Sequence, residues 1–361
     1  MIDLFQNLPN SKELHPKFLQ LRDSKSMIGE RHIIANWTEG FIDRDNKLVR
    51  EFQVSFHSTF WELYLHHLLY EQGFTTDYSH NRPDFAVVKP YRFFIEAVIS
   101  NIKYDGRPES TRNQFDILKN LTPPHLQPDF EYQMIEAIIR YSNAINNKVS
   151  KHQLEYSGLP WVDERVPFVI ALGSYSQVNF GKEYYYPMLA LLYGLFYDPL
   201  KRDYLPRDFV FKPGTSSPIN LGLFEDPKMQ NISAVIFSCT VTLGKLTSLS
   251  KSAGYSSMNT VLLIREEAKA PHFHFQEVSI NDPEQHSDGL FVFHNPNAKV
   301  KLPVEVFSDS CALQVSSNGD DYLQFSGSKA PLFSRLSLPS ILLPFEFKKS
   351  LIEETYKMFN S

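Results

Sequence analysis

Two short apolar runs constrain the fold of this 361-residue chain more than any other feature. Residues 85–88 read Phe-Ala-Val-Val and residues 93–99 read Phe-Phe-Ile-Glu-Ala-Val-Ile, with Lys-Pro-Tyr at 89–91 between them. Runs rich in Val, Ile and Phe on either side of a break that contains Pro are typical of a β-hairpin. If residues 89–91 form a three-residue loop, Val88 pairs with Arg92, and this pairing sets the register of the whole hairpin.

The same register brings two acidic side chains face to face. Counting back from the loop places Asp84 opposite Glu96. Directly opposed Cβ atoms in a sheet lie roughly 4.5–5.5 Å apart, so two carboxylates there either repel each other or share a cation. Both lie in apolar sequence, where an unpaired carboxylate is costly, and a hard divalent ion such as Mg²⁺ or Mn²⁺ is the natural partner.

A helix that carries a third acid is expected just before the hairpin. Residues 56–73 have apolar and aromatic side chains at the spacing of a buried helix face, and Gly73 is a good helix stop. The residues of that face are Phe60, Leu63, Tyr64, His67 and Leu68. The helix also carries Glu62, so one helix acid precedes the two hairpin acids along the chain.

These acids follow a known order. The chain carries in succession Glu62, Pro83-Asp84 and Ile95-Glu96-Ala97-Val98. This order resembles the PD-(D/E)XK nuclease superfamily, whose restriction-endonuclease-like core is a helix, a mixed four-stranded sheet and a second helix. The resemblance implies that Asp84, Glu96 and the backbone carbonyl of Ala97 hold a Mg²⁺ or Mn²⁺ ion, with Glu62 as an accessory acid. Where the family has a lysine, two residues after the second acid, this chain has Val98.

The helix expected over residues 130–154 supplies two candidate amines. Its apolar stripe comprises Ile135, Ile138, Ile139, Ile145 and Val149. Lys148 and Lys151 lie one turn apart at the edge of that stripe, and a lysine stem can run along apolar surface while its ammonium reaches a polar site. We therefore expect Lys148, and Lys151 second, to replace the absent strand lysine; the alternative is that both form a solvated flank.

Apolar runs further along the chain predict an α/β core. Residues 166–172 form a continuous apolar run after the helix, which is typical of a buried strand that runs parallel to its neighbour. We also expect a packed helix over residues 187–197 and a buried strand over 232–237. The expected fold class is α/β, with a restriction-endonuclease-like core, a mixed sheet flanked by helices, and a β-rich C-terminal extension.

The pattern changes to short strands after residue 258. The expected strands are 261–264, 272–278, 289–293 and 301–307. The chain is therefore divided into an N-terminal extension (1–50), a nuclease-like core (51–258) and a β-rich C-terminal region (259–361). Four histidines of this last region, His272, His274, His286 and His294, lack defined spacing, and ordinary core or surface roles are favoured over a metal site.

One long irregular segment follows the hairpin. Residues 105–128 contain four prolines together with Arg107, Arg112 and Lys119. The segment is expected to form either a loop over the active site or a solvated connection.

Composition narrows the cellular setting. Two cysteines provide neither a disulfide framework nor a zinc motif, which fits a reducing compartment. No apolar run reaches about 18 residues and no signal-like amino terminus is visible, so we expect a cytoplasmic chain that does not enter a membrane. The net charge of −5 argues against a surface coated in basic residues, but contact with phosphates depends on local lysines and arginines.

The leading functional hypothesis is a metal-dependent DNA endonuclease of a bacterial restriction or anti-phage system. RNA cleavage uses the same metal chemistry and leaves no distinguishing mark in the sequence. The alternative from another class is a nuclease-fold protein that no longer cuts and acts as a nucleic-acid-binding or assembly subunit. Val98 and the negative net charge fit that alternative, in which a partner protein or a second copy of the chain is needed.

Overall fold

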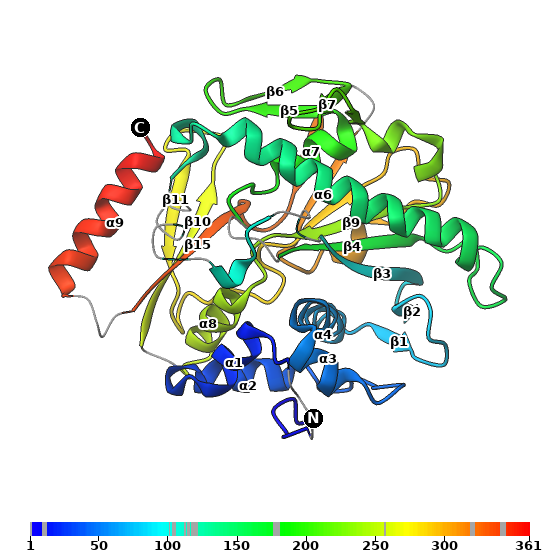
Figure 1. Cartoon of the computed structure of the whole chain (residues 1–361), viewed down its shortest axis with the longest axis horizontal. Coiled ribbons are helices and arrows are strands. Elements are labelled where there is room, and N and C mark those ends of the chain that lie inside the picture. Colours follow the sequence, from blue (N-terminus) through cyan, green and yellow to red (C-terminus); the bar gives the residue numbers. More distant parts are fainter. Residues whose placement is uncertain are drawn as a thin grey trace.

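The computed structural model has an α/β fold built around one large sheet (Figure 1). The residues described are 2–8, 13–100, 102, 106–111, 113, 116, 122–175, 181–255, 258–317, 322–339 and 344–361. The strands of the sheet, in chain order, are β1 (Thr75–Asp77), β2 (Phe85–Lys89), β3 (Phe93–Ser100), β4 (Phe168–Ser174), β9 (Ala234–Ser238), β12 (Phe291–His294), β13 (Leu313–Ser317) and β14 (Leu323–Ser326). Their spatial order is β1-β2-β3-β4-β9-β12-β13-β14.

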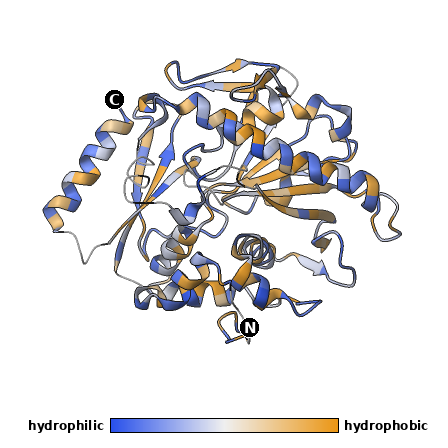
Figure 2. Cartoon of the chain, in the orientation of Figure 1, coloured by the Kyte–Doolittle hydropathy of each residue, from blue (hydrophilic) through white to orange (hydrophobic). Residues whose placement is uncertain are grey.

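The centre of this sheet is parallel and its flanks are mixed. β3, β4 and β9 run parallel to one another, whereas β2 is antiparallel to β3 and β12 is antiparallel to β9. Every residue of β4 and β9 is buried, as expected for parallel strands covered on both faces. Figure 2 shows hydrophobic residues along these central strands.

Alternating side chains of the sheet pack into two separate hydrophobic cores, one on each face. On one face, residues such as Phe94 and Ile170 pack with the helices α6 (Phe130–Lys151) and α7 (Tyr186–Tyr193). On the other face, residues such as Ile95 and Ala171 pack with the N-terminal helices. Those helices are α1 (Pro16–Asp23), α2 (Ile28–Asn36), α3 (Leu48–Val54) and α4 (Phe56–Glu71). The residue's parity along β3 therefore decides which helix layer its side chain meets.

Most of the expected core elements are confirmed. The helix predicted over 56–73 is α4, the one over 130–154 is α6, and the strands predicted over 166–172 and 232–237 are β4 and β9. The helix α6 connects β3 to the parallel strand β4, as predicted from the helix-then-apolar-strand order. The coarse prediction of an α/β fold with a mixed sheet flanked by helices is therefore correct.

Two element predictions are wrong. The helix predicted over 187–197 ends at Tyr193, because Gly194 adopts a left-handed conformation with φ of 74° and caps it. The chain then enters β5 (Leu195–Asp198), which pairs with β6 (Asp203–Pro206). The strand predicted over 301–307 is instead a loop followed by a short 3₁₀ helix, η7 (Val304–Phe307), that begins after Pro303.

The C-terminal region contributes to both sheets. A second sheet has the order β11-β10-β15, with β10 (Asn259–Glu266), β11 (Phe273–Glu277) and β15 (Leu332–Pro339), and it packs with the helix α9 (Phe345–Phe359). However, β12, β13 and β14 also lie after residue 258 and join the large sheet. The domain boundary was predicted at residue 258. The strands after that residue are divided between the large sheet and the second sheet.

The remaining elements are short. They are α8 (Leu243–Ser252), the strand pair β7 (Phe209–Phe211) and β8 (Pro218–Asn220), the π-helical turn η4 (His152–Tyr156), and the 3₁₀ helices η1 (Lys25–Met27), η2 (Glu109–Thr111), η3 (Pro124–Leu126), η5 (Leu223–Glu225) and η6 (Pro227–Met229). None of the helices in the described ranges is long and apolar enough to span a bilayer.

Candidate active site at the hairpin

The β2–β3 hairpin has the register predicted from the sequence. Its paired residues are Phe85 with Ile95, Ala86 with Phe94 and Val87 with Phe93. Continued one step past Phe85, this register sets Asp84 opposite Glu96. The paired ladder ends there, and the carboxylate of Asp84 accepts a hydrogen bond from the backbone N–H of Ala97 at 2.7 Å. The Asp84 side chain is thus tied to the strand that carries Glu96.

Two lysines of α6 reach Glu96 from the neighbouring layer. The ammonium of Lys148 donates to Oε1 of Glu96 at 2.8 Å, and that of Lys151 donates to the same oxygen at 2.9 Å. Glu96 points to the α6 side of the sheet because it shares the parity of Phe94, and its side chain is 1% exposed. The alternative of a solvated lysine flank is therefore not what the structure contains.

The second oxygen of Glu96 is not used in this arrangement. Within the described part of the chain, Oε2 of Glu96 is buried and has no hydrogen-bond partner. An unpaired buried carboxylate oxygen carries a desolvation cost that a donor or a cation would remove. Burial alone would raise the pKa of Glu96, but the nearby ammonium groups of Lys148 and Lys151 outweigh it and lower that pKa.

The other two acids have raised pKa values. Burial, followed by the negative charge of Glu96, raises the pKa of Asp84 to about 6. Burial, followed by the charge of Asp84, raises the pKa of Glu62 to about 8. Glu62 extends from α4, on the opposite side of the sheet from α6. The negative charge of Glu96 raises the pKa of Glu62 as well, although less than that of Asp84.

Tyr156 is a further site residue that sequence reasoning missed. It lies in the π-helical turn after α6, and the ammonium of Lys151 is 5.1 Å from the centre of its ring. Burial and then the charge of Glu96 raise the pKa of the Tyr156 hydroxyl. Among the described residues this hydroxyl has no well-formed hydrogen bond. Only its position one turn beyond Lys151 could have indicated it from the sequence.

Within the described part of the chain, Glu62, Asp84 and Glu96 do not form a closed cluster of ligand atoms. Among the residues that the structure describes, two groups of three His, Cys, Asp or Glu residues have ligand atoms that all lie within 4.8 Å of one another, and neither contains Glu62, Asp84 or Glu96. The first group is His15, His57 and Glu109, and the second is His67, Glu71 and His286. Of the four C-terminal histidines, His286 thus belongs to a cluster, although with partners outside the C-terminal region.

The segment after the hairpin is described only in part. Arg107 forms an ion pair with Asp116 at 2.9 Å. Asp105, Arg112 and Lys119 lie outside the described residues. The predicted loop over the active site therefore concerns residues that lie largely outside the described part of the chain. Nε2 of His294 donates a hydrogen bond to Oε1 of Gln314 at 2.8 Å, which is an ordinary core role.

Comparisons with protein-family models, with curated proteins and with solved structures found no match for this chain. The chemistry of the hairpin site is therefore inferred from its own residues.

Proposed function

We propose that this chain is a metal-dependent endonuclease of the PD-(D/E)XK type that hydrolyses phosphodiester bonds in DNA. The observation that carries the proposal is the contact of two lysines from the next helix with Glu96, the hairpin acid whose register sets it opposite Asp84. Acids and amines in one buried site are the groups that phosphodiester hydrolysis requires, because the acids hold a metal and the amines stabilise negative charge.

The donor set fits a hard divalent ion. Asp84 and Glu96 offer carboxylate oxygens, which are the ligands Mg²⁺ and Mn²⁺ prefer, and the buried Oε2 of Glu96 lacks a partner in the described residues. By resemblance, the carbonyl of Ala97 is a third donor. An ion held there would polarise the scissile phosphate and lower the pKa of a bound water.

The two lysines of α6 take the place of the missing strand lysine. Val98 shares the face of Glu96 by strand alternation, and Lys148 and Lys151 approach that face from α6. Their ammonium groups hold Glu96 ionised and provide positive charge against the phosphate in the transition state. Lys148 is the stronger candidate because its side chain is 19% exposed, whereas that of Lys151 is 34% exposed.

Glu62 completes the site as an accessory acid. With its pKa raised to about 8, Glu62 is mostly protonated at neutral pH when no cation is bound. A divalent cation beside Asp84 would favour the ionised form, since a nearby positive charge lowers the pKa of a carboxyl group. Glu62 therefore responds to metal binding and assists in holding water or the ion.

The exposed basic residues at the hairpin suit a phosphate backbone. Arg82, Lys89 and Arg92 are all exposed, and Arg82 forms an ion pair with Glu155 at 2.8 Å. Such local charges bind nucleic acid even in a chain with negative net charge. Because the bacterial nucleases of this type that stand alone often act in restriction or anti-phage defence, we propose that setting for this chain.

A second candidate function is a nuclease-fold subunit that binds nucleic acid without cutting it. Two observations favour it: both ammonium groups are directed at one oxygen of Glu96, and the three acids do not converge within 4.8 Å in the described residues. In that case the two lysines would neutralise Glu96 permanently, and a partner protein or second copy of the chain would supply activity.

Cleavage of supercoiled plasmid separates the two functions. Purified protein is incubated with plasmid DNA, and in parallel with a single-stranded RNA, in Mg²⁺ or Mn²⁺ with and without a chelator. We expect nicking of DNA that the chelator abolishes. Cleavage of RNA alone would reassign the substrate, and metal-dependent DNA binding without cleavage would favour the inactive subunit.

A further inference from the structure

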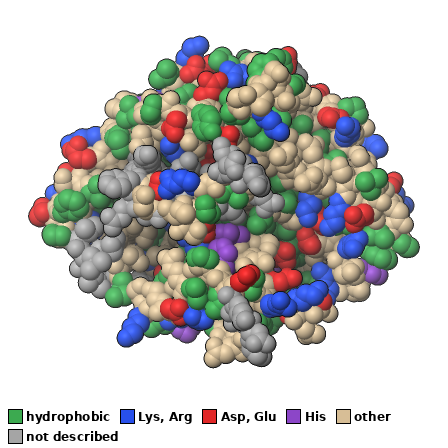
Figure 3. Space-filling model, viewed as in Figure 1, with side chains coloured by type: hydrophobic (Ala, Val, Ile, Leu, Met, Phe, Trp, Pro, Cys, Tyr) green, Lys and Arg blue, Asp and Glu red, His purple; other side chains and the backbone are tan. Residues whose placement is uncertain are grey.

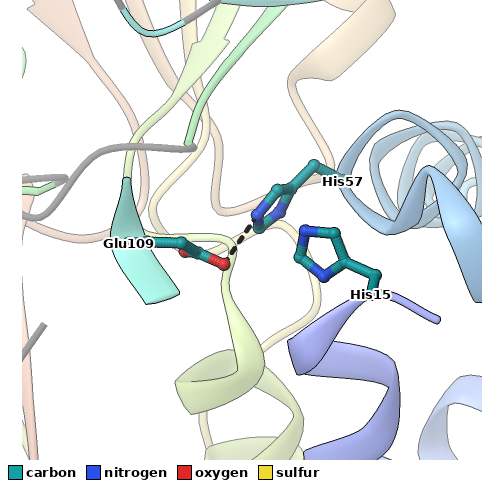
Figure 4. A group of neighbouring side chains, drawn as sticks. All are labelled: His15, His57 and Glu109. Carbon is teal, nitrogen blue, oxygen red and sulfur yellow. Dashed lines mark hydrogen bonds and ion pairs between the residues drawn. The ribbon is translucent and has the colours of Figure 1, made fainter. Parts of the chain in front are cut away.

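A second group of side chains lies away from the hairpin acids. Independently of the nuclease function, we propose that His15, His57 and Glu109 together bind one divalent transition-metal ion, with Zn²⁺ preferred. Their ligand atoms all lie within 4.8 Å of one another (Figure 4). In Figure 4 the three side chains point toward a common centre from three separate segments of the chain.

Each proposed ligand lies at the start of a helix. His15 precedes α1 as its N-cap residue, His57 lies in the first turn of α4, and Glu109 begins η2 after β3. Nε2 of His57 and Oε1 of Glu109 are already 2.8 Å apart, and the two imidazole rings have centroids 4.9 Å apart. Folding alone therefore brings the three donors together.

Aromatic neighbours fix the orientation of both imidazoles. The ring of His57 stacks on Tyr175 with centroids 5.1 Å apart and planes 5° apart. The ring of His15 stacks on Phe56 with centroids 5.6 Å apart and planes 17° apart. The side chains of His57 and Glu109 are 10% and 7% exposed. A metal ion would thus find ligands that have already lost most of their rotational freedom.

The donor set selects a zinc-like ion over magnesium. Two imidazoles and one carboxylate form the three-ligand set of zinc sites that keep a fourth position open, whereas Mg²⁺ prefers oxygen ligands alone. Bonds of about 2.0–2.2 Å in a tetrahedral arrangement set neighbouring ligand atoms roughly 3.3 Å apart. Small side-chain rotations from the present separations reach that geometry.

The fourth position would open on a cavity. His57 and Glu109 line a cavity of ≈ 370 Å³ whose other walls include Lys17, Thr242 and Arg335. Figure 3 shows histidine side chains within a hollow near the centre of this face. The cavity is large enough for water or a small polar molecule beside the ion.

Metal binding changes the hydrogen bonding of His15. Nδ1 of His15 now accepts a hydrogen bond from the backbone N–H of Lys17 at 3.2 Å, so the ring proton belongs on Nε2. An ion on Nε2 requires that this proton move to Nδ1, which ends the bond from Lys17. Three metal–ligand bonds would then replace two hydrogen bonds, the one from Lys17 to His15 and the one between His57 and Glu109. The start of α1 should therefore loosen slightly when the metal binds.

The other histidine group is the competitor. Nε2 of His67 is 3.6 Å from Oε1 of Glu71, and the Glu71 side chain is 45% exposed. Nε2 of His286 already contacts the backbone carbonyl oxygen of Tyr64 at 3.1 Å. An ion there would have to displace that contact and immobilise an exposed side chain, so we place the metal at His15, His57 and Glu109.

Cobalt titration of the full chain tests the site. The protein is stripped with a chelator, dialysed, and titrated with Co²⁺ and then Zn²⁺, with the d–d absorption of Co²⁺ as readout and metal content as stoichiometry. We expect one equivalent of Co²⁺ with a tetrahedral spectrum that Zn²⁺ displaces. The result is independent of nuclease activity, and the Asp84→Asn, Glu96→Gln double variant should give the same spectrum.

Variants locate the ion. His57→Gln and His15→Gln should each weaken Zn²⁺ binding by roughly a hundredfold or more, since loss of even an outer partner costs ten- to hundredfold. The matched controls are His32→Gln, at an exposed histidine of α2, and His67→Gln in the competing group. Absence of a tetrahedral Co²⁺ spectrum in the wild-type protein would overturn the proposal. So would loss of the spectrum in His67→Gln with retention in His57→Gln.

Discussion

Glu96 is the residue on which the candidate active site depends most. It accepts hydrogen bonds from Lys148 and Lys151 through one oxygen, while its other oxygen is buried without a partner in the described residues. A structural ion pair would be expected to satisfy both oxygens, because a half-satisfied buried carboxylate is destabilising. Under the proposed function, a divalent ion would take this second oxygen of Glu96 as a ligand.

Replacing either hairpin acid should abolish cleavage without unfolding the protein. Asp84→Asn and Glu96→Gln each remove a metal ligand and keep the side-chain volume. We expect metal-dependent nicking of plasmid DNA to fall by at least roughly a hundredfold. The matched control is Glu131→Gln, at an exposed acid of α6 with a side chain 64% exposed. Wild-type rates in Asp84→Asn would remove that residue from the mechanism.

The raised pKa of Glu62 predicts how stability depends on pH. A carboxyl group whose pKa is higher in the folded than in the unfolded state binds more protons when folded, so stability falls as pH rises between the two values. For Glu62 that window runs from its ordinary value of 4.5 to about 8. Asp84 acts in the same direction up to about pH 6.

We therefore expect the metal-free protein to lose stability between pH 6 and pH 8. The contribution of one group cannot exceed about 1.4 kcal/mol per pH unit. Chemical denaturation of the chelator-treated protein at pH 6, 7 and 8 measures the slope, and Glu62→Gln should flatten it. An unchanged slope in Glu62→Gln would show that Glu62 ionises normally in the folded protein.

At the scale of elements, α6 does two jobs. Its apolar face covers one side of the sheet through residues such as Met134, Ile138 and Ile145, and its last turn delivers Lys148 and Lys151 to Glu96. The crossover from β3 through α6 to β4 places that last turn beside the hairpin. A lysine on α6 and a lysine at position 98 of β3 would thus both place an ammonium group at the same face of the sheet.

A strand lysine should therefore compensate for the lost helix lysines. We expect the Lys148→Met, Lys151→Met double variant to lose cleavage. Adding Val98→Lys to that variant should raise its cleavage rate at least roughly tenfold. Val98 is half-buried on the face of Glu96, so a lysine there can extend along apolar surface to the site. The measurement is the initial rate of plasmid nicking. Failure of Val98→Lys to recover any activity in a folded variant would argue against this equivalence.

The elements that sequence reasoning predicted are those with strong local signals. The hairpin register followed from loop length and strand alternation, and β4 and β9 followed from uninterrupted apolar runs. The strand predicted over 301–307 failed because a Pro-led turn interrupts the apolar pattern. The helices before residue 48 were not predicted, since their stability comes from packing in the core beneath the sheet rather than from their own sequences.

The site was predictable to a similar degree. Asp84, Glu96 and the two lysines could be predicted from the sequence because strand and helix periodicity fix where their side chains point. Tyr156 was missed because a π-helical turn changes the spacing after α6. The group of His15, His57 and Glu109 was missed because its members come from three segments that only the tertiary fold brings together.

At the scale of the whole molecule, the large sheet joins both ends of the chain. β12 pairs with β9, and β13 and β14 continue the sheet beyond it. The helices α1 to α3 pack in the same core as α4 and β3. The site on β2 and β3 therefore belongs to a sheet whose three far strands, β12, β13 and β14, come from residues after 258.

Truncation after residue 258 should destroy the fold. It removes the strand that pairs with β9 and exposes a long apolar edge, which favours aggregation. We expect the fragment 1–258 to lack a cooperative unfolding transition by circular dichroism, in contrast with the full chain. A soluble fragment with a sharp transition would show that residues 1–258 fold independently.

The rate of DNA cleavage by Lys148→Met tests the central claim most directly, because it asks whether the helix amine at Glu96 takes part in phosphodiester hydrolysis. Lys349→Met, at a lysine of α9 that is 59% exposed, is the control. We predict that Lys148→Met lowers the Mg²⁺-dependent rate roughly a hundredfold with the fold retained, the loss typical of a group that stabilises transition-state charge. Full activity in the Lys148→Met, Lys151→Met double variant would contradict the account.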